Sequence, residues 1–261
     1  MPAMSALPIT VDLAWPLNVL LLSIRLGAAL ALTPFLQAMN LPVSVRVLLV
    51  LVLAVLLTAG FPASRMPAGA DWSQLLIAAF HEFLLGVALG LGVTLAFAAF
   101  SVAGRLLDLQ IGYSIGQAFD PVSRTQATIL TSLFNLGAVA LFFLTRGHHA
   151  VIRGFATVLE HVPVGQGMAR GLAAEALFRH AGMMFSLGLA LVAPVVLALL
   201  LLECGLAMMA RSLPQINMLL FGIPLKIALG LAALGLWMGS TAGPAARIQA
   251  SIFQFWEGVV R

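Results

Sequence analysis

Long apolar runs separated by short polar stretches are the feature that most restricts how this chain can fold. Six runs carry almost no charge, and they cover residues 13–36, 47–61, 75–100, 127–144, 181–210 and 216–238. A helix of about 20 residues is needed to cross a hydrocarbon core of roughly 30 Å. The runs therefore predict an all-α membrane-complex protein with about six transmembrane segments.

Charge is scarce and scattered, which excludes several classes of function. Only 8% of the residues are charged and 62% are hydrophobic, whereas soluble domains carry about 25% charged residues. The basic residues occur singly, so the dense basic face that nucleic-acid binding needs is missing. No polar block is long enough for a separate domain, and we expect residues 1–261 to form one domain. Cys204 is the single cysteine, which rules out a disulfide within the chain.

The apolar runs differ in length, and two of them contain proline. The run at 47–61 is short for a span, while those at 75–100 and 181–210 exceed the length that a bilayer requires. Pro194 and Pro224 are expected to kink or interrupt their helices. The run at 181–210 is therefore predicted to be either a bent helix or a helical hairpin. Interrupted helices are tolerated where they pack against protein or line a cavity, so we expect kinked helices in an assembly.

Glycines recur at the spacing that lets two helices approach closely. Gly86 and Gly90 form one GxxxG pattern, and Gly235, Gly239 and Gly243 form two in succession. Such patterns are typical of helix association in membranes. The repeated pattern in the last run is the stronger indication of a helix contact.

Four ionisable residues lie inside the apolar runs: Arg25, Glu82, Glu203 and Lys226. Charge at bilayer depth is costly, so such residues usually face a bundle interior or water. They are candidates for a proton relay or a gating pair. The alternative is that they form structural ion pairs or subunit contacts, and the sequence does not decide which acid meets which base.

A polar insert, residues 104–126, separates the third and fourth apolar runs. Its glycines permit unusual backbone angles, and an Asp-Pro pair favours a turn. Aromatic and aliphatic residues interrupt its polar character, which a plain surface linker seldom needs. The segment is therefore a candidate for lining or obstructing a conduit, with an ordinary packed loop as the alternative. Its key residues are Gln110, Gly112, Tyr113, Ser114, Ile115, Gly116, Phe119, Asp120 and Pro121.

Two apparent catalytic motifs fail on their context. Gly112, Ser114 and Gly116 match GxSxG, but that nucleophile elbow requires a preceding strand, and no βα pattern surrounds it. His81 and Glu82 begin HExxH, but Leu85 stands where the second histidine belongs. We therefore expect no enzymatic activity, no metal and no cofactor. A secondary transporter is the main rival from another class, and it predicts an internal repeat, which the two halves do not display.

Two segments resemble a known family. Residues 110–121 (QIGYSIGQAFDP) resemble the signature of the flagellar biosynthesis protein FliR family. Residues 213–226 (LPQINMLLFGIPLK) are similar to a second stretch of that family, and Gly147-His148-His149 is similar to its polar loop. The order and spacing agree over essentially the whole chain. Injectisome subunits share the second stretch, so a virulence-type homologue is an alternative, while Asp120-Pro121 and Gly147-His148-His149 favour the flagellar type.

The resemblance implies a core subunit of the type III protein export gate in the bacterial inner membrane, within the flagellar basal body. Such a subunit assembles with P-type and Q-type export-gate subunits into a pore for unfolded export substrates. It implies further contacts with B-type and A-type export proteins and with membrane lipids, and none with nucleic acid. Residues 110–121 correspond to a plug loop that closes the pore.

The resemblance also implies roles for individual residues. Sealing side chains are expected at Tyr113, Ile115 and Phe119, with backbone hinges at Gly112 and Gly116. The second stretch is expected to make subunit contacts through Pro214, Gln215, Asn217, Gly222 and Pro224. Lys226 is expected to make contacts within or between subunits, pairing with Glu203 or Glu82.

Overall fold

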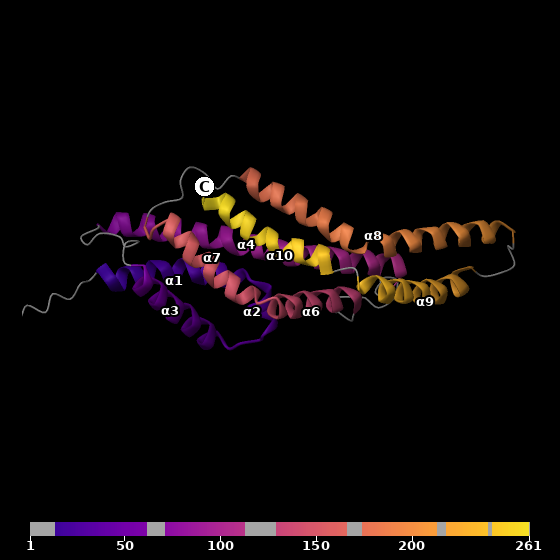
Figure 1. Cartoon of the computed structure of the whole chain (residues 1–261), viewed down its shortest axis with the longest axis horizontal. Coiled ribbons are helices and arrows are strands. Elements are labelled where there is room, and N and C mark those ends of the chain that lie inside the picture. The colour runs from indigo at the N-terminus through magenta and orange to yellow at the C-terminus, as the bar shows by residue number, and fades with distance from the viewer. Residues whose placement is uncertain are drawn as a thin grey trace, which may run out of the picture. The chain divides into compact units, whose positions relative to one another are not determined.

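Helices account for all the regular structure that is described. The computed structural model describes residues 14–61, 71–112, 129–165, 174–212, 218–239 and 242–260, and no strand occurs in those ranges. The helices, labelled as in Figure 1, are α1 (Ala14–Leu32), α2 (Pro34–Ala38), α3 (Val43–Gly60), α4 (Trp72–Ile111), α6 (Ile129–Leu144), α7 (Gly147–His161), α8 (Ala174–Ser212), α9 (Met218–Met238) and α10 (Ala242–Val260).

The predicted all-α membrane-type fold is confirmed, and each apolar run lies largely within helix. By length and composition, α1, α3, α4 and α8 can each cross a membrane. A fifth span results if α6 and α7, which meet at a bend of 69°, are counted as one broken span. The apolar stretch Phe221–Trp237 of α9 is shorter than that criterion requires. The six expected spans therefore correspond to four or five among the described residues.

Neither proline interrupts its helix. The chain stays helical through Pro194 in α8 and through Pro224 in α9. The hairpin alternative for residues 181–210 is thus wrong, and α8 instead packs against α9 (Figure 1). Proline removes one backbone donor from the helix ladder. Near this gap, the indole of Trp237 donates a hydrogen bond of 2.9 Å to the carbonyl of Leu191, so α9 supports the weakened turn of α8.

The described structure falls into two compact units. One lies within Met1–Leu91, Arg153–Gly171 and Val260–Arg261, and the other within Gly92–Ile152 and Leu172–Val259. In the first unit α1 packs against α2 and α3, and in the second α8 packs against α9. Helix α4 contributes its first half to one unit and its second half to the other. Buried leucines along α4 supply core residues to both units.

Two helices lie outside the long apolar runs. Both α7 and α10 are amphipathic, and polar and charged residues alternate with apolar ones along them. His148 and His149 fall in the first turn of α7, directly after a turn in which Arg146 has φ 57°. The expected polar loop at this position is therefore wrong, because these residues begin a helix.

The glycine patterns divide into one that makes a helix contact and one that makes none. Gly86 and Gly90 face α1, where a Cβ at Gly90 would lie 2.7 Å from the carbonyl oxygen of Ala29. A Cβ at Gly86 would collide with the carbonyl oxygen of Arg25.

The repeated pattern at Gly235, Gly239 and Gly243 does not lie on one helix. Helix α9 ends at Met238 and α10 begins at Ala242. A Cβ at any of the three would meet open space. The repeated GxxxG pattern, which was the stronger indication of a helix contact in the sequence, therefore makes no such contact among the described residues.

Candidate functional site

The first residues of the polar insert, 104–111, are helical and form the end of α4. Gln110 lies in the last turn of this helix, and Gly112 follows it with φ 94°, a left-handed angle that favours glycine. The chain is described again from Ile129, the first residue of α6. The other predicted residues of the insert lie outside the described residues: Tyr113, Ser114, Ile115, Gly116, Phe119, Asp120 and Pro121.

A buried carboxylate joins the end of α4 to the start of α6. Asp108, in the next-to-last turn of α4, is 2% exposed. Its Oδ1 accepts from the backbone N–H of Leu130 at 3.2 Å, and its Oδ2 accepts from the N–H of Thr131 at 2.9 Å. The hydroxyl of Thr131 also donates to Oδ2, at 2.7 Å. The end of α4 and the start of α6 are thus held together.

Sequence reasoning missed Asp108, although one signal was present. An acidic side chain near the C-terminus of a helix faces the negative end of the helix dipole. Such a residue in an apolar stretch needs compensation from elsewhere. In this chain the N-terminal amides of α6 supply it.

Three of the predicted site residues meet at the α8–α9 pair. The Nζ of Lys226 lies 2.6 Å from Oε1 of Glu203. The amide of Gln110 donates to the other carboxylate oxygen at 3.4 Å. The side chains of Lys226 and Glu203 are 21% and 50% exposed, so this group lies at a surface of the chain. It connects the beginning of the polar insert with the helix that follows the LPQIN segment.

The second family-like stretch is described only in part. Gly222 and Pro224 lie in the first two turns of α9. Gly222 is buried, and a Cβ there would meet the side chain of Leu206 at 3.4 Å. Pro214, Gln215 and Asn217 lie outside the described residues.

Arg25 and Glu82 form a second ion pair, which unlike the first is fully buried. Both side chains are 1% exposed, and Nε of Arg25 lies 2.5 Å from Oε2 of Glu82. Nη2 of Arg25 donates to Oε1 at 2.9 Å, and Nη1 donates to the carbonyl of Val162 at 3.0 Å. The N–H of Gly165 completes the group by donating to Oε1 at 2.9 Å. Three chain segments therefore meet at one bidentate pair, which lies inside the protein.

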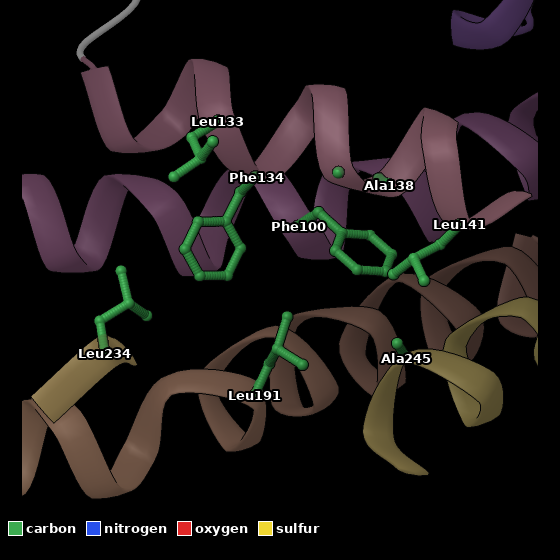
Figure 2. A pocket seen from close by; sticks show the side chains of 9 residues that line it. Phe100, Leu133, Phe134, Ala138, Leu141, Leu191, Leu234 and Ala245 are labelled. Atoms are coloured by element: carbon green, nitrogen blue, oxygen red, sulfur yellow. The ribbon is translucent and has the colours of Figure 1, made fainter. Parts of the chain in front are cut away.

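An apolar cavity of about 110 Å³ lies in the second unit. Figure 2 shows the rings of Phe100 and Phe134 and the side chains of Leu191 and Leu234 around it. Its walls come from α4, α6, α8, α9 and α10, and none of the described residues that line it is charged. These apolar side chains offer no group for chemistry, and a larger side chain at the edge could fill part of the space. Gly137 forms part of its wall.

Within the described ranges, no three His, Cys, Asp or Glu residues are grouped so that they could hold a metal ion. The polar groups described above act instead as links between helices. Two of them border the segment between α4 and α6. The arrangement is suited to holding backbone segments in fixed positions.

Comparison with known proteins gives a consistent result. The model of the bacterial export proteins, family 1, matches residues 17–250. The chain is similar to the flagellar biosynthetic protein FliR of Escherichia coli strain K12, with 26% identity over 94% of this chain and 91% of the relative. It is also similar to FliR of Bacillus subtilis strain 168, with 30% identity over 80% of this chain and 81% of the relative. FliR of Pectobacterium carotovorum is 33% identical over 60% of each chain.

Proposed function

Because the chain belongs to family 1 of the bacterial export proteins, the family of the flagellar biosynthetic protein FliR, we propose that it is a core subunit of the type III export gate. In this role it serves flagellar assembly in the bacterial inner membrane. It forms the pore for unfolded substrates together with P-type and Q-type subunits. The observation that carries the proposal is the family match over residues 17–250, which includes most of α1, the described helices from α2 to α9 and the start of α10.

Unburied apolar helices support an assembly of several subunits. Only 11% of the apolar window of α3 and 28% of that of α8 are buried within the chain. On α8, large apolar side chains such as Leu197, Leu201 and Met208 are exposed. Soluble monomers rarely expose apolar patches of this extent. Sister subunits, B-type and A-type export proteins and lipid together provide the cover that these helices need.

Residues 110–121 are proposed to be the plug loop of this pore. Tyr113, Ile115 and Phe119 provide apolar contacts that exclude water and ions, and Asp120 with Pro121 fixes the turn. Support comes from the family-like sequence of the segment and from the two ends that the described helices place together. The end of α4 and the start of α6 share the carboxylate of Asp108.

The plug is tested in the assembled complex with the length of the loop unchanged. A variant with Tyr113→Ser, Ile115→Ser and Phe119→Ser removes the apolar groups, and we expect ion leakage through the resting gate to increase. Conductance equal to that of the unchanged complex would reject the plug. Ser114→Ala is the matched control, which is expected to keep both the seal and full export. Loss of export in that control would instead favour a catalytic serine.

The assembly is tested separately by co-expression with P-type and Q-type subunits. We expect one stable species that contains all three proteins after purification. A chain that purifies alone and transports small solutes would support the transporter alternative. This experiment does not depend on the identity of the plug residues.

A further inference from the structure

A line of polar contacts runs between α4 and α6 in the second unit. The hydroxyl of Ser101 donates to Oδ1 of Asn135 at 2.6 Å. One turn along α4, Gly104 lies against Thr131, where an added Cβ would be 2.5 Å from the Cα of Thr131. Another turn along, Asp108 accepts from Leu130 and Thr131. These residues recur at intervals of three and four, so they share one face of α4.

The geometry at Asp108 is that of a helix cap supplied by another helix. The first four N–H groups of a helix lack intrahelical acceptors, and in α6 these belong to residues 129–132. Asp108 satisfies two of them, and its negative charge lies at the positive end of the α6 dipole. Both carboxylate oxygens act as acceptors, which a neutral amide at this position cannot reproduce.

Gly104 makes this capping geometry available. Without a side chain, position 104 lets the backbone of Thr131 approach α4 directly. Asp108 stands four residues later, on the same face and within reach of the amides that follow the insert. The close packing at Gly104 and the hydrogen bonds to Asp108 therefore depend on each other. They fix the place where the chain leaves α4 relative to the place where it enters α6.

From this arrangement we infer that Asp108 is the positioning residue of the plug loop, with Gly104 and Thr131 as its partners. Asp108 ties the end of α4 to the start of α6, which are the described elements on either side of the segment 113–128. The inference rests on the proposed function, because it assigns the fixed ends to the loop that seals the gate. It adds a residue outside the family-like segment to the sealing apparatus.

The test uses the full chain in the assembled complex, with Asp108→Ala, Asp108→Asn and Thr131→Val. Amide hydrogen exchange is measured for the peptide that covers residues 129–132. Asp108→Ala removes both acceptors, so exchange there should become about tenfold faster or more. Asp108→Asn keeps one acceptor oxygen and should have a smaller effect. Thr131→Val removes only the hydroxyl and should have the smallest effect. Ser132→Ala, an exposed neighbour on α6, is the control and should change nothing.

Ion leakage per assembled complex is the second readout, and a merely structural residue would not change it. Leakage should rise in the order of the exchange rates, toward the level of the triple serine variant of the loop. If Asp108→Ala does not assemble, the proposal is tested by whether leakage falls in the order Asp108→Asn, Thr131→Val, Ser132→Ala. Unchanged amide exchange at residues 129–132 in the Asp108 variants would show that Asp108 does not cap α6. Faster exchange with a tight gate would overturn the positioning role, while leakage in the triple serine variant would still support the plug. A tight gate in the triple serine variant would instead reject the proposed function of the loop.

Discussion

The buried pair of Arg25 and Glu82 gives the sharpest prediction for stability. Two arginine nitrogens bind the two oxygens of Glu82, and both side chains are excluded from solvent. Replacing either residue by methionine keeps most of the side-chain volume but leaves its partner as an uncompensated buried charge. Removing one member of a buried pair typically costs about 3–5 kcal/mol. We expect a loss of this size from Arg25→Met and from Glu82→Met alike.

The double variant should cost less than the sum of the two single variants. It leaves no unpaired charge, and two methionines fill a space similar to that of the original pair. It still removes the partners of the Val162 carbonyl and the Gly165 N–H, and each buried group left unsatisfied costs roughly 1–3 kcal/mol. The double variant should therefore cost about 2–6 kcal/mol, against a sum of roughly 6–10 kcal/mol for the single variants. The interaction energy between the two positions should thus reach or exceed about 3 kcal/mol, the upper end of the range usual for residues in contact.

Equilibrium unfolding of the full chain in detergent, followed by far-UV circular dichroism, measures these free energies. Arg105→Met is the matched control, because Arg105 is an exposed arginine on α4. A surface change of this kind should stay within about 0.5 kcal/mol. Strictly additive single variants would refute the reasoning, as would an Arg25→Met protein that is as stable as the control. Either result would mean that the pair is not desolvated as its burial indicates.

Two further predictions follow from contacts of single residues. Gly86→Ala should destabilise the chain by about 1–3 kcal/mol, because the added Cβ meets the backbone of Arg25. Gly137→Ala should instead stabilise the chain by about 0.5–1 kcal/mol, because the added Cβ enters open space beside the cavity and alanine favours the helix. Thermal unfolding in detergent measures both, and a shared sign would contradict the packing argument. Lys226→Met should change the free energy of unfolding by only about 0–1 kcal/mol, because its partner Glu203 is half exposed, but it should impair co-purification or export. If assembly and export both stayed intact, the contact role of Lys226 would be wrong.

The helical fold followed from the sequence because apolar runs identify helices by composition alone. The same argument failed where composition is mixed. In the amphipathic helices α7 and α10, charged and polar residues interrupt the apolar ones, so neither helix forms an apolar run. The polar loop at His148 and His149 was expected from the family resemblance, and the structure has a helix there. The two prolines led to the opposite error, because interruptions were expected where the helices continue. Pro194 removes one hydrogen bond, and the packing of α8 on α9 holds the helix together at that point.

The sequence identified which ionisable residues belong to the site, but it did not show which of them pair with each other. The four ionisable residues in apolar runs were found from their position alone, since buried charge is rare. Their pairing depends on helix contacts across 57 and 23 positions of sequence, which no local pattern encodes. The same limit applies to glycine. Gly86 and Gly235 both begin GxxxG patterns, and only the first faces another helix of the described chain.

Helix α4 solves one packing problem in the same way at two places. In its first half, Glu82 stands four residues before Gly86, and α1 approaches over the glycine while Arg25 reaches the carboxylate. In its second half, Asp108 stands four residues after Gly104, and the start of α6 approaches over the glycine while its amides reach the carboxylate. Glycine lowers the distance between backbones, and a carboxylate one turn away supplies a directional bond that apolar packing lacks. If this coupling is general in the chain, Gly104→Ala should weaken the Asp108 cap without touching Asp108 itself. Faster amide exchange at Leu130 and Thr131 in Gly104→Ala is then the expected result, and unchanged exchange would mean that the carboxylate alone positions α6.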